Sequence, residues 1–265
     1  MILKNKLFIS LILLIVVVGG LTFMFKTMNV IAESDNKTVQ EDSSFTNIEI
    51  TTNNAEVVIV PTKSSEATVE YTGANKKKKY IFNVDVKGDT LSVQLKQKRR
   101  FFFSFGFHSG DLKLAVSVPE KQYKNLQVKS DNGRISVENL QSERVLLETD
   151  NGQIHVKKVE AKTVNVETDN GEVVLENVLG EIKGITDNGQ ISLITNSIDW
   201  PIDLSTDNGS IEVKTESEPE NARIDAKTDN GKVAIFGDRD KDVTYGKGKY
   251  LIKLRTDNGP ITVTK

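Results

Sequence analysis

The sequence predicts an all-β protein: a single parallel β-solenoid built from roughly 19-residue repeats and preceded by one N-terminal transmembrane helix. Two observations predict the solenoid. The tripeptide Asp-Asn-Gly occurs seven times, and apolar and polar residues alternate on both sides of it. A third observation, an uncharged apolar run near the N-terminus, predicts the helix.

The composition narrows the possible classes of function. The 265 residues include 35 Lys and Arg and 37 Asp and Glu, a near balance that argues against a nucleic-acid partner. There is no Cys, which excludes disulfides, Cys-ligated zinc and thiol nucleophiles. The only two His, His108 and His155, leave little for a histidine metal site. We therefore expect neither a metal nor a cofactor.

The apolar run, residues 7–25, reads LFISLILLIVVVGGLTFMF. As a helix it would span roughly 28 Å, close to the thickness of the hydrocarbon layer. Lys4 and Lys6 precede it and acidic residues dominate after it, which predicts a short cytoplasmic N-terminus, residues 1–6. The alternative is a signal peptide cleaved after the small residues at 30–32. Both interpretations place the body of the chain outside the cytoplasm.

Residues 26–44 are polar, have no apolar period and are expected to form a linker. Residues 45–265 would then form the extracytoplasmic solenoid domain.

Each Asp-Asn-Gly follows Ser or Thr, and aliphatic residues stand two and four places after the Gly. Asn-Gly between strands also suits hairpins, and hence an antiparallel meander. A meander has no reason to keep every turn the same, whereas a solenoid stacks like positions at about 4.8 Å. We therefore favour the solenoid. The turns are Asp131-Asn132-Gly133, Asp150-Asn151-Gly152, Asp169-Asn170-Gly171, Asp187-Asn188-Gly189, Asp207-Asn208-Gly209, Asp229-Asn230-Gly231 and Asp257-Asn258-Gly259.

We interpret these turns as structural. Gly would supply positive φ, Asn would tolerate it, and Asp or Thr side chains would accept hydrogen bonds from backbone N–H groups. The Asp side chains of a stacked column repel one another, and a bound cation would relieve that repulsion, so a calcium site is the alternative. Known calcium loops, however, carry several carboxylates, whereas each turn here carries one. The Asp residues are also equivalent, whereas catalysis needs paired groups in unequal environments. We expect no enzyme activity; a polysaccharide-active β-helix enzyme is the alternative.

A basic, Phe-rich insert interrupts the pattern before the first repeat. Residues 76–100 contain nine basic and two acidic residues. A hairpin centred near Gly88 would place Lys79 opposite Lys98. The Phe residues would cap the open end of the solenoid, and the basic residues would add a docking site for anionic lipid or a teichoic-acid-like polymer. The residues of this candidate site are Lys76, Lys77, Lys78, Lys79, Lys96, Lys98, Arg99, Arg100, Phe101, Phe102 and Phe103.

The last strand of the pattern, residues 259–265, has no following repeat to pair with and is expected to be an exposed edge. Pro260 lacks an N–H group and Lys265 adds charge, so both would discourage edge-to-edge association. We therefore expect a monomer.

The repeats, the Val116-Ser117-Val118-Pro119-Glu120-Lys121 stretch and the single anchor together resemble the bacterial putative-adhesin family of unknown function. LiaG-like proteins of Gram-positive envelope-stress operons are anchored examples of that family. The resemblance covers residues 45–265 and implies a β-solenoid. It further implies an adhesin-like or envelope-stress protein that binds an envelope component and has other envelope proteins as partners. A shared fold does not define the ligand.

Overall fold

The computed structural model describes residues 33–39, 45–74, 79–98 and 112–265, and every regular element in these ranges is a β-strand. Within these ranges, no helix is long and apolar enough to cross a membrane. The expected anchor, residues 7–25, lies outside the described residues. Part of the expected linker is a strand instead, because Glu33–Val39 forms β1 and pairs antiparallel with β4 (Ala67–Ala74).

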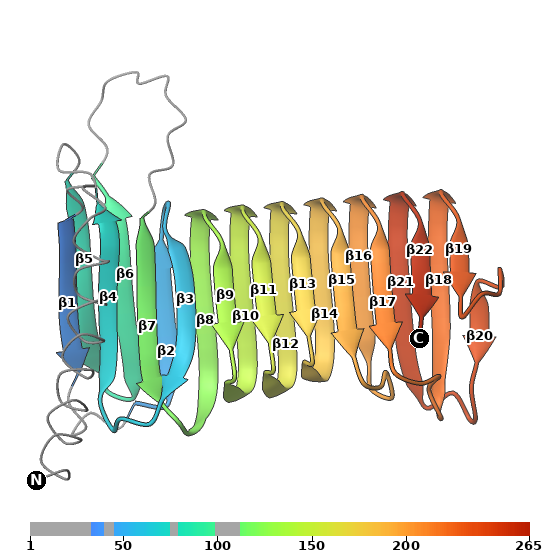
Figure 1. Cartoon of the computed structure of the whole chain (residues 1–265), viewed down its shortest axis with the longest axis horizontal. Helices are drawn as coiled ribbons and strands as arrows, with labels where there is room; N and C mark the ends of the chain where they lie inside the picture. The colour runs from blue at the N-terminus through green and yellow to red at the C-terminus, as the bar shows by residue number, and fades with distance from the viewer. Residues whose placement is uncertain (1–32, 40–44, 75–78, 99–111) are drawn as a thin grey trace, which may run out of the picture.

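Two 11-stranded sheets form the two faces of an elongated solenoid, which we call the rack (Figure 1). The first sheet contains, in spatial order, β1, β4, β7 (Lys113–Pro119), β3 (Glu56–Thr62), β9 (Ile135–Glu138), β11 (Ile154–Lys157), β13 (Val173–Glu176), β15 (Ile191–Thr195), β17 (Ile211–Thr215), β22 (Ile261–Thr264) and β19 (Val233–Ile235). The second contains β5 (Tyr80–Lys87), β6 (Thr90–Gln97), β2 (Asn47–Thr52), β8 (Gln122–Asn132), β10 (Gln141–Asn151), β12 (Glu160–Asn170), β14 (Leu179–Asn188), β16 (Ile202–Asn208), β21 (Tyr250–Asn258), β18 (Ala222–Asn230) and β20 (Asp242–Thr244).

Each regular coil consists of one long strand, an Asp-Asn-Gly turn and one short strand, and like positions of neighbouring coils pair in parallel. Thr149 pairs with Thr168 in the second sheet, and Ile154 pairs with Val173 in the first. Alternate residues point inward, so Val164 and Ile154 are both fully buried. The interior is therefore a stack of aliphatic columns, which confirms the solenoid and excludes the meander.

Antiparallel pairs occur at the two ends of the rack. At one end β4 pairs with β7, and β5 pairs with β6 in a hairpin whose register joins Lys87 to Thr90. The backbone N–H of Lys98 donates to the carbonyl oxygen of Lys79 at 2.7 Å. The predicted turn at Gly88 and the predicted pairing of Lys79 with Lys98 are thus confirmed. At the other end, β20 pairs antiparallel with β18.

The expectation that the last strand is an exposed edge is wrong. The coil formed by β21 and β22 lies between the coil β16–β17 and the coil β18–β19, so Ile261 pairs with both Ile211 and Val233. Residues 236–249 lead the chain around the outside of β18 and back into this gap. A strand in that position satisfies its backbone groups on both sides, whereas an end strand leaves one side unpaired. Lys265 forms an ion pair with Glu218 at 2.7 Å.

Candidate binding groove and turn ladder

The seven Asp-Asn-Gly turns stack along one edge of the rack, the upper edge in Figure 1. Their Asn side chains form a continuous amide ladder, in which each Nδ2 donates to the Oδ1 of the neighbouring coil at 2.9–3.0 Å. The ladder continues at 3.1 Å to Asn54, which lies between β2 and β3. In spatial order it comprises Asn54, Asn132, Asn151, Asn170, Asn188, Asn208, Asn258 and Asn230.

The glycines of the turns have a different role from the predicted one. Of the seven, only Gly133 and Gly259 have positive φ, at 153° and 154°. A Cβ atom on Gly171 would overlap the carbonyl oxygen of Gly152 in the neighbouring coil, far inside the 3.0 Å that real Cβ atoms keep. The same collision with the neighbouring coil occurs at Gly152, Gly189, Gly209 and Gly231. Gly is required here because backbones approach closely.

The Thr and Asp side chains of the turns also differ from expectation. The hydroxyl of buried Thr168 donates to the carbonyl oxygen of Gly152 at 3.0 Å, so it joins two coils and does not bond its own turn. The carboxylate of Asp169 is exposed to solvent, and the same holds for five of the other six. In the described part of the chain, no group of three His, Asp or Glu residues could hold a metal ion.

The structure places only part of the predicted basic site. Lys79, Lys96 and Lys98 lie at the open end of the β5–β6 hairpin, whereas Lys76, Lys77, Lys78, Arg99, Arg100, Phe101, Phe102 and Phe103 lie outside the described residues. This end of the core is covered by rings of β5: Phe82 packs edge-on against Tyr71, with ring centroids 4.8 Å apart.

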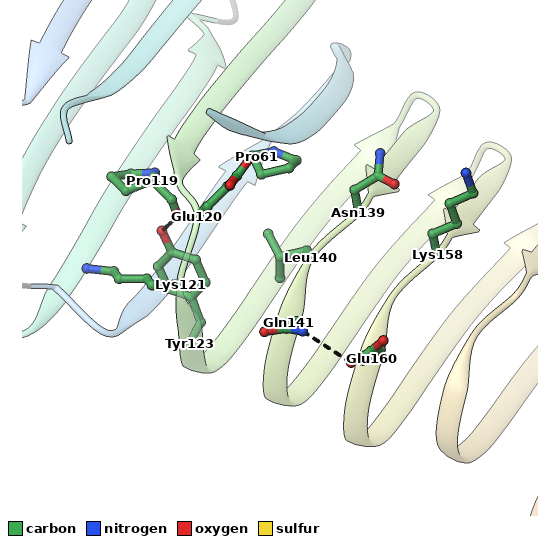
Figure 2. A pocket seen from close by; sticks show the side chains of 10 residues that line it. All are labelled: Pro61, Pro119, Glu120, Lys121, Tyr123, Asn139, Leu140, Gln141, Lys158 and Glu160. Carbon is green, nitrogen blue, oxygen red and sulfur yellow. Dashed lines mark hydrogen bonds between the residues drawn. The ribbon is translucent and has the colours of Figure 1, made fainter. Parts of the chain in front are cut away.

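A groove follows the opposite edge, where each short strand leads into the next long strand. Its first section has a volume of about 460 Å³ and lies between Pro61, Pro119 and Lys158 (Figure 2). Two further hollows of about 290 and 340 Å³ continue it and share Glu160 and Leu179. Leu179 is 41% exposed there, an apolar patch beside polar side chains.

The corner residues of this groove have left-handed backbone conformations. The φ angles are 54° at Asn139, 51° at Lys158 and 52° at Asn177, which occupy equivalent places in three successive coils. In the sequence, only the repeated Glu-Asn pair before Leu140 and Val178 signals this edge, which is too weak a pattern to predict a groove. Asn is one of the few residues that tolerate this conformation well.

Polar groups of the groove are held in place by specific contacts. The Nε2 of Gln141 donates to the Oε2 of Glu160 at 3.2 Å (Figure 2). The ammonium of Lys121 lies 4.6 Å from the ring centroid of Phe45 and 5.4 Å from that of Tyr123, and burial lowers its pKa. The hydroxyl of Tyr123 donates to the carbonyl oxygen of Pro119 at 2.7 Å, and burial raises the pKa of Tyr123.

Among the described carboxylates, every resolved pKa shift is downward. Hydrogen bonds from Lys157 and Arg223 lower the pKa values of Glu176 and Asp242. Burial opposes ionisation of Asp199, but hydrogen bonds, chiefly from the backbone N–H of Asn221, outweigh it and lower the pKa. A general acid in glycoside cleavage needs the opposite shift.

Comparison with known proteins agrees with this architecture. The family model described as Toastrack DUF4097 matches residues 45–199. No curated protein matches the chain. Among solved structures, a putative adhesin from Bacteroides fragilis is 12% identical, with 89% of this chain and 98% of that chain covered and a TM-score of 0.51. That likeness concerns the fold alone.

Two other solved structures are less similar in shape. A putative cell adhesion protein from Clostridium sporogenes is 14% identical, with 88% of this chain and 99% of that chain covered and a TM-score of 0.45. A putative adhesin from Parabacteroides distasonis is 13% identical, with coverages of 88% and 96% and a TM-score of 0.35. Because the family model matches more than half of the residues, this chain belongs to the Toastrack DUF4097 family.

Proposed function

We propose that the protein is a membrane-anchored, non-catalytic, adhesin-like scaffold of the bacterial cell envelope that binds an extended envelope component along its edge groove. The observation that carries the proposal is the groove itself, which continues across successive coils and is lined by equivalent positions of each. Such a surface suits a long ligand with repeating units, whereas catalysis needs unequal groups converging at one place.

The proposed anchor is the apolar segment, residues 7–25, with the folded body outside the cell; a secreted form released by signal-peptide cleavage is the alternative. Because β1 begins at Glu33, only residues 26–32 separate it from the anchor, a reach of at most about 25 Å. The β5–β6 hairpin lies at the same end of the rack as β1. Its basic residues Lys79, Lys96 and Lys98 would therefore meet anionic lipid headgroups.

We propose a monomer. The outermost strands at the far end, β19 and β20, are only three residues long, and short edge strands offer little for another copy to pair with.

Two measurements on the full-length chain test the proposal. External protease should degrade the folded body in intact spheroplasts, and the purified chain should co-sediment with washed envelope fragments. The variant Gln141→Ala/Glu160→Ala should lose most of the sedimented fraction, whereas the control Glu212→Ala, on the exposed face of β17, should not. Protection from protease, equal sedimentation of both variants, or release of soluble sugar from the fragments would contradict it.

A further inference from the structure

Two lysines of the groove lack an acidic partner within the described part of the chain. Among the described residues, no ion pair includes Lys121 or Lys158. Lysines close to them in sequence are paired: Lys157 contacts Glu176 at 2.7 Å and Lys162 contacts Glu143 at 3.1 Å. The groove thus keeps two positive charges available for a ligand.

Lys158 has a left-handed backbone conformation that lysine seldom adopts. The equivalent residues of the adjacent coils are Asn139 and Asn177, which tolerate a φ near 50°, whereas a lysine there is strained. Strain of this kind is often stored at functional sites. The conformation places an exposed ammonium at the junction of two hollows of the groove.

Lys121 is held in a different way. Its ammonium lies over the buried rings of Phe45 and Tyr123, which fixes the charge at one end of the first section of the groove. Figure 2 shows Lys121 and Lys158 on opposite sides of Leu140 and Gln141, so the two charges are separated along the groove.

We propose that the groove binds a linear, hydroxyl-rich polyanion, either an acidic polysaccharide or a polyol phosphate, whose spaced acidic groups pair with Lys121 and Lys158. The amide of Gln141 and the carboxylates of Glu120 and Glu160, which also line the groove, would bond to hydroxyl groups between the charges. Those carboxylates also repel a densely charged chain such as polyphosphate. This inference rests on the proposed function, because it names the class of envelope component.

Binding is measured with the full-length chain in mild detergent, by fluorescence anisotropy of labelled oligogalacturonate and labelled poly(glycerol phosphate). At least one of them should bind, and affinity should fall as salt rises. The probe that binds more tightly identifies the acidic group. Lys158→Asn should weaken binding at least about fivefold while leaving the fold intact or more stable. Lys121→Gln should have a similar effect, whereas Lys121→Arg keeps the positive charge and should bind as tightly as the wild type.

Lys214→Asn is the matched control, because Lys214 is exposed on β17 and lines none of the three hollows; the affinity of this variant should stay within about twofold of the wild type. Failure of both polyanions to bind, equal binding of neutral dextran or polyphosphate, or unchanged affinity in Lys121→Gln/Lys158→Asn would overturn the inference. If that double variant still co-sediments with envelope fragments, the proposed scaffold function survives and only the ligand class fails.

Discussion

The side chains of Asn208 and Asn258 form a hydrogen bond of 3.0 Å although 50 residues separate them in the chain. Asn230, which lies between them in sequence, instead donates to the far side of Asn258, also at 3.0 Å. The amide ladder therefore passes from the fifth turn to the seventh and ends at the sixth. The C-terminal coil is an internal part of the rack, and several consequences of that placement and of the ladder can be measured.

The C-terminal strand should contribute as much stability as a central one. Ile261 is fully buried between two coils, so Ile261→Ala should lower the free energy of unfolding by about 2–5 kcal/mol in urea denaturation. The outward-facing Thr262→Ala should change it by less than about 0.5 kcal/mol. Pro260→Val should leave the oligomeric state unchanged in light scattering, since this position is not at an edge. A loss below about 1 kcal/mol for Ile261→Ala would mean that the strand is frayed.

Two glycine substitutions distinguish the cost of filling the space between neighbouring backbones from the cost of a left-handed φ angle. Gly171→Ala should destabilise by about 3 kcal/mol or more, because its Cβ has no space between the coils. Gly88→Ala, at a φ of 61° with nothing within 4 Å, should cost only about 1 kcal/mol. The two losses are read from thermal unfolding of the same preparation. Equal losses would show that the coils separate easily at the turn.

Within one turn, replacing the Asn should lower the stability of the fold, and replacing the Asp should not. Asn170→Ala removes two side-chain hydrogen bonds and should cost about 1–2 kcal/mol. Asp169→Asn changes an exposed carboxylate and should be neutral or slightly stabilising, because it relieves repulsion along the column. Both are compared by chemical denaturation with and without calcium. A calcium-dependent rise in the melting temperature that Asp169→Asn abolishes would make the column a cation site.

Lys158→Asn should stabilise the protein by about 0.5–1 kcal/mol, because Asn relieves the strain of a left-handed backbone that Lys tolerates poorly. The control Lys162→Asn lies four residues away in β12 and should give no gain. Differential scanning calorimetry detects the shift in melting temperature. A lower melting temperature for Lys158→Asn would show that the lysine has a stabilising partner.

Asp199 should make stability depend on pH in the acid range. Its carboxylate accepts hydrogen bonds from the backbone N–H groups of Asn221 and Glu220 at 2.8 and 3.2 Å, joining two connecting loops. Because its pKa is lowered below 3.8 in the folded protein, its contribution is present above that pH and is lost as the pH falls through the folded pKa.

Asp199→Ala should therefore cost about 1–2 kcal/mol near neutral pH, and this difference from the wild type should shrink below about pH 4. Urea unfolding at several pH values measures the difference. A gap of constant size across the range would show that the carboxylate's charge is irrelevant to the contact.

Much of the fold follows from local pattern. Identical turns at a nearly constant spacing can be satisfied only if each coil stacks on the next in register, so the seven Asp-Asn-Gly turns and the alternation around Ile154 and Val173 suffice to predict a parallel solenoid. The hairpin at Gly88 was predictable for the same reason, because turn chemistry and strand alternation are both local signals.

Tertiary structure alone decided three features. The chain order of the coils is not their spatial order, because the long connection at residues 236–249 lets β21 and β22 return between earlier coils. The Gly and Asn of each turn are needed for contacts with the neighbouring coil, and these contacts exist only after the coils have stacked. Lys121 and Lys158 come from separate turns, and folding places both of them along one groove. Sequence determines the repeating unit, whereas pairing between distant segments determines the end coils, the ladder and the binding edge.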